Sequence, residues 1–202
     1  PSMKSRLFMV PGTAASILLI ITTIVTAMGL AREREIGTME QLLVTPIRPI
    51  TLMIGKTIPY AVFGLVDMAL ILIVGNLVFE VPIRGSLGVI FLGALLYLLG
   101  TLAVGLLIST VARTQQQALM GGFFFLLPAL LLSGFLTPVD SMPGWIRPIT
   151  WLNPIRFFIE VVRGALLRGA TLSDLAPHFA MLLLLGTSFL ALAALRFRRQ
   201  LG

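Results

Sequence analysis

Five long runs of hydrophobic residues, separated by short polar segments, dominate the pattern along the chain. The runs cover approximately residues 8–30, 58–78, 87–111, 118–136 and 177–195. Each is close to or above the roughly 20 apolar residues that a helix needs to cross the hydrocarbon core of a bilayer. The pattern therefore predicts an all-α membrane protein, in which residues 1–202 form a single transmembrane domain with about five transmembrane helices.

The composition supports this class and explains the charge. Hydrophobic residues make up 57% of the chain and charged residues only 11%, whereas soluble domains carry about a quarter charged residues. The formal net charge is +7, but the Lys and Arg residues lie at the edges of the hydrophobic runs or in short loops. Because cations at helix ends meet lipid headgroups, membrane lipid is the expected partner of these charges and nucleic acid is not.

The basic residues at the end of the chain indicate an orientation. Arg196, Arg198 and Arg199 follow the last hydrophobic run, and an excess of basic residues is typical of cytoplasmic flanks. Counted over all loops in this orientation, these three included, the 15 basic residues divide almost evenly between the two sides. In this orientation residues 32–46 are cytoplasmic and residues 137–176 are extracytoplasmic.

The first of these segments, residues 32–46, is predicted to form a short amphipathic helix. Its apolar residues fall on one face and its charged residues elsewhere, and Pro46 ends it because the residue before a proline is disfavoured in helical geometry. The apolar face comprises Ile36, Met39, Leu42 and Leu43. Two interpretations remain open from the residues alone: a helix solvated at the membrane surface, or one that docks in a groove of a soluble partner.

The second segment, residues 137–176, is too rich in proline for one continuous helix. Asn153 and Pro154 are predicted to be the N-cap and first residue of a new helix. Its apolar stripe comprises Ile155, Phe158, Ile159, Val162 and Leu166. Its apolar runs are too short to span, so we expect a re-entrant helical hairpin, with Trp145 and Trp151 at headgroup level. It is either an outer gate or a lid that only packs the bundle. The gate candidates are Pro138, Met142, Pro143, Asn153, Pro154, Glu160 and Arg163.

Two polar residues interrupt the second hydrophobic run. A carboxylate at the centre of a transmembrane helix costs about 2.5–3.5 kcal/mol on insertion scales, so Asp67 is expected to face a neighbouring helix or an aqueous cavity. Asp67 and Asn76 are candidates for a substrate pathway. For Asp67 a proton pathway and a hydrogen-bonded packing role stay equally open.

A stripe of small residues marks the third run. Thr101, Gly105 and Ser109 follow one another at four-residue spacing, a pattern that lets helices approach closely in membranes. The stripe fits packing within one subunit as well as an interface between subunits.

No catalytic or metal site is expected. The chain has no cysteine and one histidine, His178, with no carboxylate at ligand spacing. Gly55-Lys56-Thr57 resembles the end of a phosphate-binding loop, but Ile50 stands where that motif requires glycine. We therefore expect no enzyme activity and no bound cofactor in this chain, and any ATP would be bound by another subunit.

Several segments also resemble a known family. Residues 33–46, EREIGTMEQLLVTP, closely resemble the cytoplasmic signature of ABC-type-2 export permeases. Residues 138–143, PVDSMP, followed by Asn153-Pro154 and Arg163-Gly164, resemble the re-entrant region before the last helix of that family. Further matches are Lys4-Ser5, Val10-Pro11-Gly12, Gly55-Lys56 and Pro59-Tyr60.

The resemblance implies a six-helix permease in the bacterial inner membrane. Such permeases form homo- or heterodimers and dock two cytoplasmic ATPase subunits, which bind ATP and Mg²⁺. Residues 32–46 would then be the coupling helix. The coupling candidates are Glu33, Glu35, Gly37, Thr38, Glu40, Thr45 and Pro46.

The implied function is export of a hydrophobic or amphiphilic, drug-like molecule. Export of lipid or glycan by the same architecture and proton-coupled secondary transport through Asp67 are the alternatives. The family also has a first helix and usually an extracytoplasmic domain that this sequence lacks, so we expect it to be a C-terminal portion.

Overall fold

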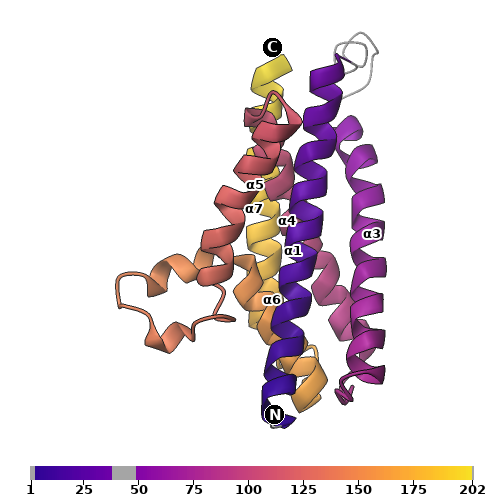
Figure 1. Ribbon diagram of the computed structural model, residues 1–202, viewed down its shortest axis with the longest axis vertical. Helices are drawn as coiled ribbons and strands as arrows, with labels where there is room; N and C mark the ends of the chain where they lie inside the picture. The colour runs from indigo at the N-terminus through magenta and orange to yellow at the C-terminus, as the bar shows by residue number, and fades with distance from the viewer. Residues whose placement is uncertain (1–2, 38–48, 202) are drawn as a thin grey trace.

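The computed structural model describes residues 3–37 and 49–201 of the chain. Helices joined by turns make up these residues, and Figure 1 shows the long ones lying side by side as a bundle. The α-helices are α1 (Met3–Ile36), α3 (Pro49–Leu77), α4 (Leu87–Val111), α5 (Gln115–Leu131), α6 (Pro154–Arg163) and α7 (Ala176–Leu201). Shorter turns are η1 (Val139–Ser141), η2 (Arg147–Leu152) and the π-helical η3 (Gly164–Arg168).

Four of these helices coincide with four of the predicted runs and are candidate membrane spans. They are long and apolar enough to cross a membrane over Met9–Ile36, Ile54–Leu77, Leu87–Val111 and Ala176–Phe197. The fifth predicted run, residues 118–136, forms α5, which has 17 residues and is therefore only about 26 Å long. The helix stops early because the chain turns at Gly134, whose φ is +81°. The count of five spanning helices thus stays a prediction.

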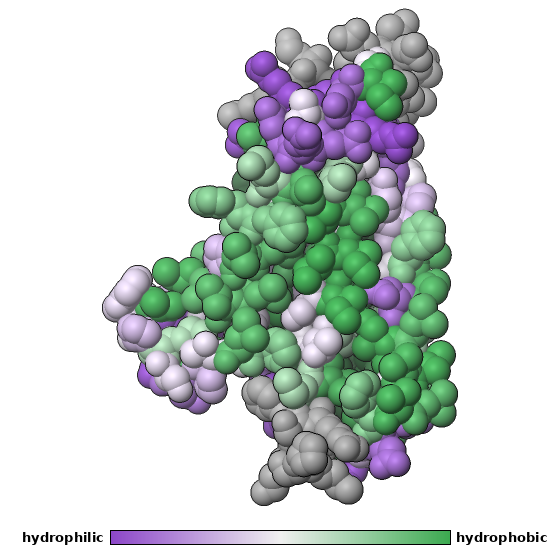
Figure 2. Space-filling model, viewed as in Figure 1, coloured by the Kyte–Doolittle hydropathy of each residue, from purple (hydrophilic) through white to green (hydrophobic). Residues whose placement is uncertain are grey.

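The surface in Figure 2 has the distribution of a membrane-spanning bundle. Hydrophobic residues cover its middle, and hydrophilic residues gather at one end, near the C-terminus. We call this end the polar end. Among the described residues it carries Arg32 to Glu35, Lys56 and Arg113.

Helix α4 is the centre of the bundle, in contact with α1, α3, α6 and α7. Its Tyr97 is fully buried, donates a hydrogen bond to the Ala15 carbonyl oxygen of α1 at 2.9 Å, and stacks on Phe158 of α6 with ring centroids 4.3 Å apart. One side chain therefore links three helices. By contrast α3 and α7 scarcely touch each other.

The small-residue stripe of α4 packs against α1 of the same chain. Thr22 Oγ1 donates to Thr101 Oγ1 at 2.9 Å. A Cβ atom added to Gly105 would lie 2.8 Å from the Thr23 carbonyl oxygen, so the two backbones meet there. The stripe thus has the intrachain packing role.

The segment 137–176 differs from the expected hairpin of two helices. Closely spaced prolines limit its first part to the 3₁₀ turns η1 and η2, and α6 is its one regular α-helix. The predicted apolar stripe, which continues from α6 into η3, is confirmed as buried, with each member at most 2% exposed: Ile155, Phe158, Ile159, Val162 and Leu166. Residues 136–152, which we call the arm, project sideways from the bundle (Figure 1).

We predict that Gly105→Ala destabilises the bundle, because the new methyl group meets backbone rather than a movable side chain. A clash of this kind typically costs about 1–3 kcal/mol, which lowers the midpoint of thermal unfolding in detergent. Gly55→Ala is the matched control: a Cβ atom there meets nothing within 4 Å, so its midpoint should stay or rise. Equal midpoints for the two variants would contradict the close approach of α1 and α4.

Candidate functional site

Three consecutive charged residues in the last turn of α1 each hold a different helix. They are Glu33, Arg34 and Glu35, and all three lie at the polar end, which α1 reaches after crossing the apolar middle of the bundle. Successive residues on a helix point about 100° apart. Three adjacent side chains can therefore reach three neighbours.

Arg34 binds the end of α4. One Nη1 atom donates to the carbonyl oxygens of Thr110 at 3.2 Å and Ala112 at 3.4 Å. The last carbonyl groups of a helix have no partner within it and carry a partial negative charge, so a guanidinium is a suitable cap. Hydrogen bonds to a charged group typically contribute about 1.5–3 kcal/mol.

Glu33 and Glu35 bind the helices on either side. The Glu33 carboxylate forms an ion pair with the Lys56 ammonium on α3. The Glu35 carboxylate accepts hydrogen bonds from Gln115 at the start of α5, at 3.1 Å from the backbone nitrogen and 3.4 Å from Nε2. A carboxylate is favourable there because the N-terminus of a helix carries a partial positive charge.

The predicted coupling helix therefore does not begin as a separate helix at Arg32. Residues 32–36 continue α1, because their side chains are held by the neighbouring helices. The helix ends at Ile36, and Gly37 follows it with a φ of +82°, which suits glycine. The other coupling candidates, Thr38, Glu40, Thr45 and Pro46, lie outside the described residues.

The two pathway candidates are not brought together. Asp67 lies in the middle of α3, half-buried, and within the described residues its Oδ2 atom is buried without a hydrogen-bond partner. Asn76 lies near the end of the same helix, where its side-chain nitrogen donates to the Val81 carbonyl oxygen at 3.1 Å. Nine residues separate them, which is about 13.5 Å along a helix.

The gate candidates fall into two groups. Asn153 caps α6, since its Oδ1 atom accepts from the backbone nitrogen of Ile155 at 3.2 Å while Nδ2 donates to the Ala129 carbonyl oxygen of α5 at 2.6 Å. Pro154 is the first residue of α6, as predicted. Glu160 pairs with Arg163 at 3.0 Å on the same helix and with Arg168 at 3.4 Å. Pro138, Met142 and Pro143 lie in the arm.

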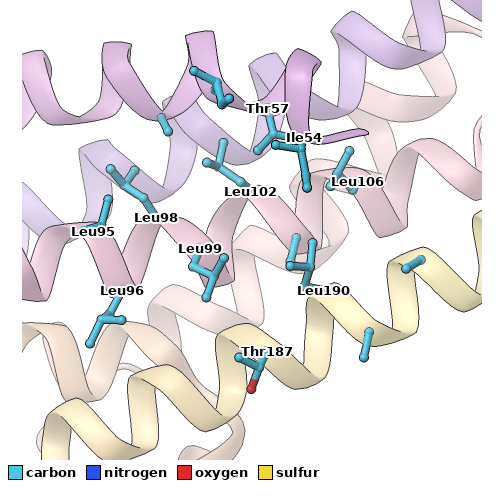
Figure 3. A pocket seen from close by; sticks show the side chains of 15 residues that line it. Ile54, Thr57, Leu95, Leu96, Leu98, Leu99, Leu102, Leu106, Thr187 and Leu190 are labelled. Carbon is cyan, nitrogen blue, oxygen red and sulfur yellow. The ribbon is translucent and has the colours of Figure 1, made fainter. Parts of the chain in front are cut away.

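An apolar groove of about 610 Å³ runs over α4 between α3 and α7. Figure 3 shows Ile54, Leu102 and Leu190 from the three helices turned toward it. Its polar side chains are Thr57 and Thr187, and the Thr187 hydroxyl donates to the Leu183 carbonyl oxygen of its own helix at 2.7 Å. The groove therefore offers hydrocarbon surface and no charged group. No cluster of three His, Cys, Asp or Glu residues that could hold a metal occurs within 3–37 and 49–201.

The comparisons with known proteins identify the family. The family described as "ABC-2 type transporter" matches residues 2–167. The chain belongs to the ABC-2 type transporter family. Relatives from Escherichia coli K12 include the "Probable multidrug ABC transporter permease" YbhR, 37% identical over 99% of this chain, and YbhS, 38% identical over 100% of it. The "Inner membrane transport permease YhhJ" of the same strain is 36% identical over 91%.

These relatives are longer than the sequence in hand. The chain spans about half the length of the relatives it matches: 54% of YbhR and YbhS and 49% of YhhJ. Membership of the ABC-2 type family, together with four apolar helices, makes it a multi-pass membrane protein.

Glu33 and Glu35 were among the coupling candidates predicted from the sequence, whereas Arg34, Lys56 and Gln115 were not. These three residues make the contacts that join the end of α1 to α3, α4 and α5. A cation in the last turn of a helix and a carboxylate before the next helix are recognisable signals. They do not reveal which helix lies beside which, so the partners could not be assigned from one sequence.

We predict a charge-swap rescue at the Glu33–Lys56 pair. Glu33→Lys and Lys56→Glu each place two like charges side by side at a partly buried position, which should cost about 1 kcal/mol or more and lower the unfolding midpoint by a few degrees. The double variant restores the attraction and should recover most of the loss. A double variant that melts at the sum of the two single losses would show that the pair does not join α1 to α3.

Proposed function

We propose that this chain is the membrane-embedded part of a permease subunit in an ATP-driven exporter of the bacterial inner membrane. A separate cytoplasmic ABC ATPase, which binds ATP and Mg²⁺, would dock at residues 32–46. A second permease copy, identical or different, would complete the transmembrane pathway. Family membership supports the ATPase partnership, and the polar end would then be cytoplasmic.

The observation that carries the proposal is the set of contacts at the end of α1. The predicted docking segment, residues 32–46, contains near its start Glu33, Arg34 and Glu35, which bind α3, α4 and α5. A displacement of that segment therefore acts on four helices through short polar contacts. An isolated surface loop would need no such connection.

The mechanism that follows is alternating access driven from outside the chain. ATP-dependent closure of the ATPase pair would displace the docking segment, and α1 would carry the movement to the other helices. Such a change is a shift between two states, so ATP must bind one state better than the other. A shift from 1:99 to 99:1 needs about 5.5 kcal/mol of differential binding, well within what two nucleotides can supply.

The proposed cargo is a hydrophobic or amphiphilic small molecule. The apolar lining of the groove over α4 supports this class, because a charged solute would find no partner there. The word "multidrug" in the names of YbhR and YbhS agrees with it. Export of lipid or glycan by the same architecture is the alternative within this proposal.

We predict that Glu40→Lys abolishes capture of the ATPase by the permease. The measurement is a pull-down from detergent with an ABC ATPase subunit encoded in the same gene neighbourhood. Glu80→Lys is the control, since Glu80 is exposed in the turn between α3 and α4, at the opposite end of the bundle. Glu35→Gln tests whether the contact with α5 carries movement from the docking segment to the bundle. The ATPase should still bind this variant, but the stimulation of its activity by cargo should fall.

The outcomes separate docking from transmission. Loss of capture in Glu40→Lys alone supports docking at residues 32–46. Equal capture by all variants would refute that location, and a wild-type permease that captures no ATPase would refute ATP-driven export.

A second candidate function is proton-coupled secondary transport through Asp67. The observation in its favour is the buried Oδ2 atom of Asp67, which lacks a hydrogen-bond partner in the described part of the chain. A carboxyl group in this position is a common feature of proton pathways in membranes. This candidate predicts transport driven by a pH gradient without ATP.

We predict that Asp67→Asn keeps the fold and reduces transport. The amide preserves the shape and removes the charge, so the variant should elute as a single species in size-exclusion chromatography. Transport into vesicles is measured once with ATP and once with only a pH gradient. Unchanged transport in both assays would leave Asp67 with a packing role alone.

A further inference from the structure

The arm carries both tryptophan residues of the sequence and exposes them. Trp145 is 75% exposed and Trp151 is 52% exposed. Three aliphatic side chains beside them are also exposed: Leu136, Ile149 and Leu152. Such a cluster of large apolar residues on a projecting segment needs a covering surface, because leaving it in water would be unfavourable.

Two arginines, Arg147 in the arm and Arg156 on α6, bond to groups of the arm. Arg147 donates from Nε to the Met142 carbonyl oxygen at 3.1 Å and from Nη2 to the Asp140 carbonyl oxygen at 2.6 Å. The Arg156 guanidinium bonds to the Thr150 hydroxyl and lies 5.1 Å from the centre of the Trp151 ring. These contacts give the arm a defined shape and pair both guanidinium groups with its polar and aromatic groups.

The level at which the arm leaves the bundle can be measured along α1. Phe135, at the base of the arm, packs on Gly12 so closely that a Cβ atom there would overlap the ring. From Gly12 to Arg32, the first charged residue in the direction of the polar end, α1 runs for 20 residues. That is about 30 Å at 1.5 Å per residue, the thickness of the hydrocarbon core. If Arg32 marks one limit of the hydrocarbon, the arm leaves at the other.

We propose that the arm is an interfacial anchor that binds the lipid headgroup layer of the leaflet opposite the polar end. Tryptophan is enriched at that level because its ring is apolar and its N–H needs a polar partner. The arm projects sideways from the bundle and does not continue along its long axis (Figure 1). A lipid surface is favoured over water by the exposed rings, and over the hydrocarbon interior by the non-helical backbone, which is not tolerated in lipid without partners.

The anchor would set the depth of α6. The arm leads directly into Asn153, which caps α6 and at the same time bonds to Ala129 of α5. A segment fixed at the headgroups therefore fixes the start of the re-entrant helix. This inference rests on the membrane-spanning bundle and does not depend on ATP-driven export.

Tryptophan fluorescence tests the proposal directly. The protein is reconstituted in phosphatidylcholine vesicles with bromine near the headgroup end or near the terminus of the acyl chains. The difference between wild type and Trp145→Phe/Trp151→Phe isolates the signal of the arm. We expect the shallow bromolipid to quench this fluorescence more than the deep one, and iodide in the solution to quench it little.

Each other outcome would overturn the anchor. Strong quenching by iodide without quenching by bromolipid would place the arm in water. Quenching by the deep bromolipid that equals or exceeds quenching by the shallow one would place the arm inside the hydrocarbon. Protection from every quencher would mean that protein, such as a second copy of the chain, covers the two rings. The single variants Trp145→Phe and Trp151→Phe show whether both rings share one environment.

Discussion

The close approach of α1 and α4 is the contact on which the rest of the bundle depends. Lipid gives apolar helices no hydrophobic reason to associate, so association relies on close packing and hydrogen bonds. Gly105 removes the side chain that would separate the two backbones, and the Thr22–Thr101 hydrogen bond joins the two helices directly. With α1 fixed on α4, Tyr97 can reach both Ala15 and the ring of Phe158, which brings α6 to the same centre.

The same contact determines where the charges at the end of α1 fall. Because α1 lies along α4, Arg34 arrives beside the last carbonyl groups of α4, and Glu35 beside the first nitrogen of α5. Each charge meets a helix end of the opposite partial sign, which is favourable and directional. Packing in the membrane therefore places the residues that a soluble partner would act through, and the candidate site is a consequence of the fold.

The sequence predicted what depends on local composition. Four spanning helices, the cap at Asn153 and the buried stripe of α6 followed from runs of apolar residues, proline positions and helical spacing. It did not predict that residues 32–36 continue α1 or that α5 ends at Leu131. Contacts of the side chains with α3, α4 and α5 extend α1, and the turn at Gly134 ends α5. Neither follows from the apolar run alone. The stripe on α4 showed the same limit, since spacing alone could not distinguish intrachain packing from an interface.

Helix α1 connects the proposed docking end of the molecule to the proposed lipid anchor. Its polar end holds three helices through charged side chains, and about 30 Å away its Gly12 receives Phe135 at the base of the arm. Because one continuous helix joins them, a displacement imposed at one end moves the other end as well. If the headgroup layer holds the arm while the docking segment moves, the helices between must tilt relative to the membrane rather than slide through it. Rocking is therefore the motion that this arrangement of contacts favours, because sliding would pull the arm out of its layer.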